Sequence, residues 1–109
     1  MTRDAGLEQM LTEDIAGVTD ITTTKMFGGF AWMWQGHLLC CARHDGILYR
    51  LGKGQDAWAL DLPDVAPMIM GGKPMPGWVR LTGAAMGDDA LRHRMIAAAQ
   101  AFVATLPAK

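Results

Sequence analysis

The chain has 109 residues, of which 50% are hydrophobic and 19% are charged, and its formal net charge at pH 7 is −1. This composition is that of one globular domain over 1–109, and it excludes a disordered chain and a general electrostatic grip on nucleic acid. No apolar run approaches the roughly 20 residues of a membrane-spanning helix, and the first residues lack the apolar core of a signal peptide. We therefore expect a cytoplasmic protein that binds neither membranes nor nucleic acid directly.

Hydrophobic periodicity predicts helices and strands along the whole chain. The helices are expected over 3–16, 55–60 and about 90–106, and the strands over 21–27, 30–35, 38–43, 47–51, 68–70 and 78–81. The composition of 71–77, rich in glycine and proline, predicts a loop. Asp88 or Asp89 caps the last helix. The order α-β-β-β-β-α-β-β-α predicts an α+β fold with two layers, in which helices flank an antiparallel sheet.

A glycine pair, Gly28 and Gly29, separates two apolar runs at the start of the strand-rich region. Two glycines at this place indicate a bulge or sharp turn with positive φ, or a close approach of backbones. The alternative is a phosphate-binding loop, which would need a G-x-x-x-x-G-K-[ST] or G-x-G-x-x-G frame that leads into a helix. Neither frame is present in the sequence, so we interpret the pair as structural.

Two turns that contain glycine set the predicted pairing of the central strands. Gly36-His37 fits a two-residue hairpin turn with glycine at its first central position, and Asp45-Gly46 fits a type I′ turn. The pairing across these turns decides which side chains share a face of the sheet, because successive residues of a strand point to opposite faces.

In this register, one face of the sheet combines aromatic residues with arginines: Trp32, Trp34, Arg43 and Arg50. This composition is typical of binding hot spots, and Arg50 comes near enough to Trp32 for a cation–π contact. We therefore interpret these four residues as a candidate interaction surface. The alternative is that the short helix and the 71–77 loop cover this face from within the chain. A register slip of one residue would exchange the two faces.

No catalytic or metal-ligating constellation is recognisable in the sequence. The histidines lack the spacing of metal ligands and the aspartates fall at turn and cap positions; these residues are His37, His44, His93, Asp61, Asp64, Asp88 and Asp89. Lys73, within its glycine-rich segment, is weak evidence for an anion site. We therefore predict no catalytic residue, no metal and no cofactor.

The sulfur-containing residues allow two interpretations each. Cys40 and Cys41 are adjacent, so in a strand they point to opposite faces and a disulfide between them would be strained. We interpret them as small buried apolar residues, with a vicinal redox switch as the alternative. The nine methionines fill irregular gaps of the core or mark an adaptable binding surface, and we favour core filling for most of them.

Several short motifs together resemble the TfoX/Sxy N-terminal-domain family. The opening signature is Lys25-Met26-Phe27-Gly28-Gly29, and the likeness continues through Gly36, Leu48-Tyr49-Arg50-Leu51, Gly72-Lys73-Pro74-Met75, Gly77-Trp78-Val79 and Leu106-Pro107. The resemblance implies one two-layer α+β domain, similar to secretion chaperones, and a relation to regulators of natural competence, which act through other proteins. Those regulators carry a further C-terminal helical domain, and we expect this chain to be a single-domain member without it. The family brings no agreed catalytic residues.

Two functions are open at this point. The first, which we favour, is a non-enzymatic interaction or regulatory module that acts as a homodimer or with another protein. The second is a small-molecule-binding protein or enzyme, with a pocket between the Met26–Phe30 turn and the 71–78 segment. A flat, exposed face of aromatic residues and arginines would favour the first function, and polar groups that converge in a concave pocket would favour the second.

Overall fold

The computed structural model describes residues 5–26 and 28–107, and its strands form a six-stranded antiparallel sheet in the order β1-β2-β3-β4-β6-β5. The helices are α1 (Ala5–Asp14), α2 (Ala57–Leu60), the 3-10 helix η1 (Gly83–Gly87) and α3 (Asp89–Val103). The strands are β1 (Ile21–Met26), β2 (Gly29–Trp34), β3 (His37–Arg43), β4 (Gly46–Arg50), β5 (Val65–Met70) and β6 (Lys73–Leu81). This order of elements confirms the predicted α+β fold.

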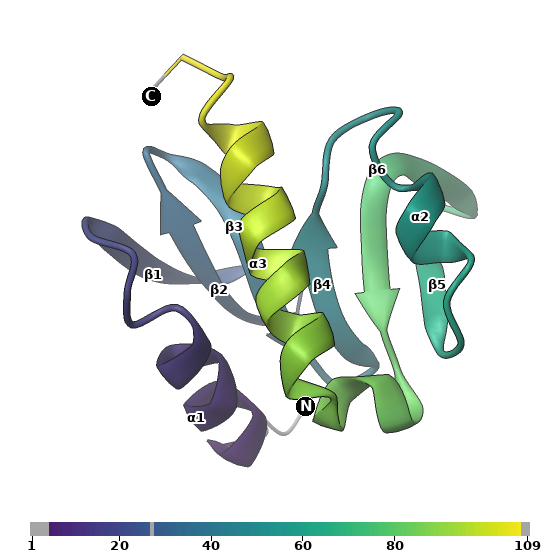
Figure 1. Ribbon diagram of the computed structural model, residues 1–109, viewed down its shortest axis with the longest axis horizontal. Helices are drawn as coiled ribbons and strands as arrows, with labels where there is room; N and C mark the ends of the chain where they lie inside the picture. The colour runs from purple at the N-terminus through teal and green to yellow at the C-terminus, as the bar shows by residue number, and fades with distance from the viewer. Residues whose placement is uncertain (1–4, 27, 108–109) are drawn as a thin grey trace.

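The helices of the described residues lie on one side of the sheet (Figure 1). The longest helix, α3, passes over β3 and β4, which it contacts, while α1 packs beside it and α2 lies against β5. Asp88 caps α3, because its Oδ1 accepts a hydrogen bond from the Leu91 backbone N–H at 3.0 Å. The molecule therefore has a helix layer and a sheet layer, and the second face of the sheet has no helix from the described part of the chain over it.

The main core lies between these two layers. Helix α1 contributes Leu7 and Leu11, and α3 contributes Met95, Ala99 and Val103. The sheet contributes fully buried residues from its inner strands, namely Leu39, Cys40, Ile47, Tyr49, Val79 and Leu81. Each large apolar side chain buried here contributes about 2 kcal/mol to folding before the entropy cost is counted, so this cluster carries the fold.

A buried ion pair joins α1 to α3. The Arg92 Nε lies 2.8 Å from Asp14 Oδ2, and both side chains are at most 5% exposed. Arg92 also donates to the Met86 backbone carbonyl at 3.0 Å and to the carboxylate of Asp89. The hydrogen bond that Arg92 donates to the Asp14 carboxylate is the main reason that the pKa of the Arg92 guanidinium is raised above its ordinary value. The pair therefore fixes the position of α1 on the helix layer.

Both central hairpin turns differ from the prediction. The turn between β2 and β3 is Gln35-Gly36, with φ values of 54° and 83°, because Trp34 pairs with His37. Two positive φ values are those of a type I′ turn, whose first central position glutamine rarely occupies, so no residue type at position 35 pointed to this turn. In the next hairpin Arg43 pairs with Gly46, so the predicted Asp45-Gly46 turn lies one position too far along the chain.

A bulge in β3 then changes which residues share a face. Met33 pairs with Leu38 but Trp32 pairs with Cys40, so Leu39 is an extra residue in β3. Leu39 and Cys40 both belong to the core under the helices, whereas Leu38 belongs to a separate cluster on the other face. The predicted register is therefore wrong, and with it the grouping of both tryptophans with both arginines on one face.

The segment 71–77 also differs from its prediction as a loop. Gly71 and Gly72 form a tight turn with φ values of 59° and 78°, and β6 begins directly after it at Lys73, which pairs with Met70. Five residues that were predicted to be loop therefore extend β6. The 3-10 helix η1 was not predicted, and the first helix and first strand of the prediction each include residues outside the described ranges.

The glycine pair closes the hairpin between β1 and β2. Gly28 has a φ of 71°, in the left-handed region that favours glycine. Gly29 begins β2, and a Cβ atom there would lie 2.1 Å from the Ala42 carbonyl oxygen in β3. The pair thus combines a turn with positive φ and a close approach of two backbones.

Candidate interaction surface

The face of the sheet opposite the helices has an apolar centre. Its fully or almost fully buried residues are Ala31, Leu38, Cys41, Leu48 and Met68. The partly buried residues packed over and around them are Met26, Met33, Met75 and Trp78. We call these nine residues the methionine face.

Methionine side chains provide much of the cover over this centre. Ala31 and Cys41 are 0% exposed, although no helix of the described residues lies over them. Long, unbranched methionines such as Met26 and Met33 bend over short neighbours and can change conformation at little cost. Met95 in the main core and Met68 in the second cluster agree with core filling, while Met26, Met33 and Met75 pack half-buried over the second cluster.

Two arginines at one end of the methionine face share a single carboxylate. The Arg43 Nε lies 3.0 Å from Asp45 Oδ1, and the Arg80 Nη1 lies 3.1 Å from Asp45 Oδ2. The Arg43 Nη1 also lies 3.4 Å from the Met68 sulfur. One carboxylate neutralises one of the two guanidinium charges, so this end of the face carries a net positive charge.

The excess of basic side chains is a feature of the sheet as a whole. The six strands, all within the described residues, contain no aspartate or glutamate, and their basic residues are Lys25, Arg43, Arg50, Lys73 and Arg80. The described carboxylates lie in α1, α3 and the connecting segments. The charges that sum to −1 are therefore unevenly distributed, because the sheet is positively charged and the helix layer is more negatively charged.

Arg50 does not contact Trp32, contrary to the prediction. Its guanidinium carbon lies 5.2 Å from the ring centroid of Trp78 and 5.3 Å from that of Phe102 in α3. Both distances allow cation–π contacts, which hold Arg50 at the end of β4.

The four predicted interaction residues are thus divided between three places. Trp32 is 3% exposed within the core under the helices, and Trp34 packs against the same core. Arg43 borders the methionine face, and Arg50 lies at the end of β4. Sequence reasoning missed the four methionines of the face, Trp78 and Arg80, although the absence of carboxylates from the predicted strands was a signal for its charge.

The two thiols are buried on opposite sides of the sheet. Cys40 belongs to the core under the helices and Cys41 to the methionine face, and both are free and 0% exposed. Burial raises the pKa of Cys41 to about 11, and burial also raises the pKa of Cys40. Because the thiolate is the reactive form, the fold suppresses the chemistry of both residues.

We expect the native protein to resist iodoacetamide at about pH 8, with less than about a tenth of the thiol modified in the time that modifies the urea-unfolded chain completely. Mass spectrometry of the alkylated protein measures both reactions. The raised folded pKa values also mean that the stability they contribute is present below the ordinary thiol pKa and is lost as the pH rises toward about 11. Rapid labelling of either cysteine in the native protein would contradict this expectation and favour the alternative interpretation of the pair as a vicinal redox switch.

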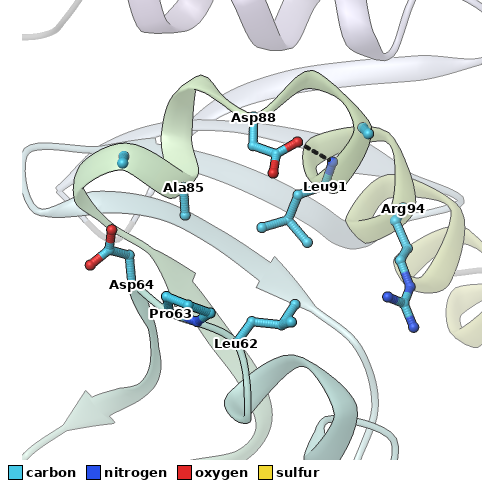
Figure 2. Close-up of a pocket in the computed structure, with 9 residues that line it drawn as sticks. Leu62, Pro63, Asp64, Ala85, Asp88, Leu91 and Arg94 are labelled. Atoms are coloured by element: carbon cyan, nitrogen blue, oxygen red, sulfur yellow. Dashed lines mark hydrogen bonds between the residues drawn. The ribbon is translucent and has the colours of Figure 1, made fainter.

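A pocket of about 450 Å³ lies between the end of α2, η1 and the start of α3 (Figure 2). Its apolar lining includes Leu62 and Leu91, while Asp64, Asp88 and Arg94 lie apart around its rim. The Asp88 carboxylate already caps α3. The polar groups therefore do not converge on one point, and nothing in their geometry indicates a reaction.

Two further pockets lie near the ends of the helix layer. One of about 580 Å³ separates α1 from η1 and the turn between β3 and β4, and one of about 450 Å³ lies between α3 and the segment after β4. None of the three pockets is lined by residues of 26–30 or 71–78, where the sequence predicted one. Within residues 5–26 and 28–107, no group of three histidine, cysteine, aspartate or glutamate residues is placed to hold a metal ion.

No protein-family model matches the chain, and no curated protein or solved structure matches it at a significant level. The resemblance to the TfoX/Sxy N-terminal-domain family therefore stays a prediction. In the described part of the chain, no helix has the length and apolar character needed to cross a membrane.

Proposed function

We propose that the protein is a non-enzymatic protein-interaction module and that the methionine face is its binding surface. The observation that carries this proposal is an apolar sheet face over which the described residues place no helix. The buried centre is covered by Met26, Met33, Met75 and Trp78, which are only half-buried and so present an apolar surface to a partner. The predicted relation to competence regulators, which act through other proteins, supports the same function.

The shape of this surface fits a protein better than a small molecule. The methionine face extends over all six strands, from β1 at one edge to β5 at the other, and its polar groups are arginines at its border rather than a set that points into a cavity. Small ligands need a concave site with a few convergent polar groups, whereas protein interfaces place arginine, methionine and aromatic residues around an apolar centre.

The proposal predicts that Met33→Lys weakens partner binding at least ten-fold, because it places a charge among the half-buried apolar side chains that would contact the partner. The matched control is Ala97→Lys, which adds the same side chain at an exposed position of α3. A photo-crosslinking residue introduced at Met33 identifies the partner in cells, and titration of the purified partner then compares wild type with both variants. Circular dichroism checks that each variant is folded.

Two results would contradict the proposal. The first is a partner that crosslinks from position 97 but not from position 33. The second is a purified partner that binds the Met33→Lys variant as tightly as the wild type.

A further inference from the structure

We infer that the segment that covers the methionine face is an amphipathic helix of another protein, with carboxylates on both sides of its apolar stripe. This inference rests on the proposed function and specifies the chemistry of the partner. It follows from the charge of the sheet, the geometry of its strands and the side chains that the face presents.

The charge of the sheet selects an acidic partner. Arg43 and Arg80 share Asp45, so a positive charge remains at their end of the methionine face. Arg50, at the end of β4, contacts two aromatic rings and forms no ion pair with a carboxylate of the described residues. Carboxylates beside an apolar stripe would approach these guanidinium groups while the stripe covers the methionines.

The partner's backbone is expected to be helical because the face offers side chains and no free backbone. Strands β2, β3, β4 and β6 are paired on both sides, so their N–H and C=O groups are used within the sheet. A helix satisfies its own backbone hydrogen bonds and can lie across a sheet as α3 does on the opposite face.

The edges of the sheet are poor templates for an added strand. The edge strand β5 contains Pro67, which has no N–H to donate, and the edge strand β1 exposes the polar run from Thr22 to Lys25. A strand added at either edge would also make no contact with most of the half-buried methionines of the face. Docking across the face is therefore favoured over docking at its edges.

A second copy of this chain fits the face less well. A two-fold axis through the face would bring both copies of the Arg43 and Arg80 pair to the same interface, where like charges repel. A homodimer through the methionine face is therefore disfavoured, and self-association becomes an outcome that the test must detect.

Nucleic acid also fits the face less well. Single-stranded binding surfaces stack successive bases on aromatic side chains. Among the described residues, one aromatic ring, that of Trp78, belongs to the methionine face, and it already contacts Arg50. Flexible thioether side chains suit the varied apolar side chains of a protein helix.

Three peptides of about 18 residues test the inference, each with the same leucine stripe on a helix of about five turns. The flanking positions are Glu in the first peptide, Gln in the second and Lys in the third. By fluorescence anisotropy, we expect the Glu peptide to bind at least ten-fold more tightly than the Gln peptide, and the Lys peptide to bind most weakly. The ratio of the affinities of the Glu and Gln peptides should fall several-fold between about 50 mM and about 300 mM salt, because salt screens the charges.

Variants of the protein locate the effect. Arg80→Gln is expected to weaken the Glu peptide about five-fold and to leave the Gln peptide unchanged. The matched control is Arg94→Gln, which removes the same charge from the helix layer, where Arg94 lies 3.9 Å from the Trp58 ring centroid. This control should change neither affinity, and melting curves verify that both variants are folded.

Equal binding of the Glu and Gln peptides would overturn the acidic partner while leaving the interaction module in place. Failure of all three peptides to bind would overturn the helical occupant. A single-stranded oligonucleotide that binds more tightly than the Glu peptide, or wild-type protein that sediments as a dimer lost in Met33→Lys, would replace the occupant with nucleic acid or a second copy. A failure of the proposed function gives a different result, namely a partner that crosslinks from position 97 but not from position 33.

Discussion

Asp14→Ala is expected to lower the free energy of unfolding by about 3 kcal/mol, because it leaves the buried guanidinium of Arg92 without its main partner. Arg92 and Asp14 are 5% and 4% exposed, so water cannot replace the lost carboxylate without opening the contact between α1 and α3. Urea denaturation followed by circular dichroism measures the change.

Asp89→Ala provides the matched control. Asp89 also pairs with Arg92, but its side chain is 77% exposed, so its removal should cost no more than about 1 kcal/mol. If the two variants lose similar stability, Asp14 does not hold α1 on the helix layer as the structure indicates. His93, whose Nε2 lies 3.2 Å from Asp14 Oδ1, loses the same carboxylate, but its side chain is 60% exposed, so water replaces that contact at little cost.

Strong local signals made much of the fold predictable from the sequence. The periodic apolar residues of α3 and the Asp88 cap located this helix to within a few residues. The β-branched and aromatic runs located the first four strands equally well. These features depend on neighbours in the chain, and for such features sequence patterns are informative.

The faces of the sheet were not predictable, because they depend on single-residue events without a local signal. Gln35 adopts a φ of 54° in the first turn, and Leu39 is the extra residue of a bulge. The displaced turn shifts each cross-strand pair by two residues and leaves the faces unchanged. The bulge shifts the pairing by one residue, so Trp32 pairs with Cys40 and the face of the tryptophans no longer includes Arg43. Trp32 therefore entered the core, and the predicted interaction surface was divided.

The charge of the sheet was visible in the sequence, but its position was not. The predicted strands already contained no carboxylate, and Arg43 and Arg50 were recognised as candidates. Arg80 lies near Arg43 because β4 pairs with β6, although α2 and β5 separate these two strands in the sequence. The sequence carries no local signal for a pairing between such distant segments. The glycine- and proline-rich start of β6 concealed a strand whose pairing with β5 shifts between Pro67 and Ile69.

Gly29→Ala is expected to destabilise the protein by about 3 kcal/mol, near the upper end of the cost of overpacking. The added Cβ atom would lie 2.1 Å from the Ala42 carbonyl oxygen and 3.2 Å from the Arg43 Cα. These are backbone atoms of a central strand, so no side-chain rotation can relieve the overlap. Separation of β2 from β3 would disturb both faces of the sheet at once.

Two other glycines make this prediction specific. Gly17 is exposed with no atom within 4 Å of a Cβ, so Gly17→Ala should leave the melting temperature almost unchanged. Gly28→Ala, at a φ of 71° in an exposed turn, should cost an intermediate amount of about 1 kcal/mol from backbone strain. Thermal unfolding of the three variants gives the order directly. The cost depends on the contact between the new Cβ atom and β3. If the Gly29→Ala and Gly17→Ala variants have the same melting temperature, β2 and β3 do not approach as closely as the structure shows.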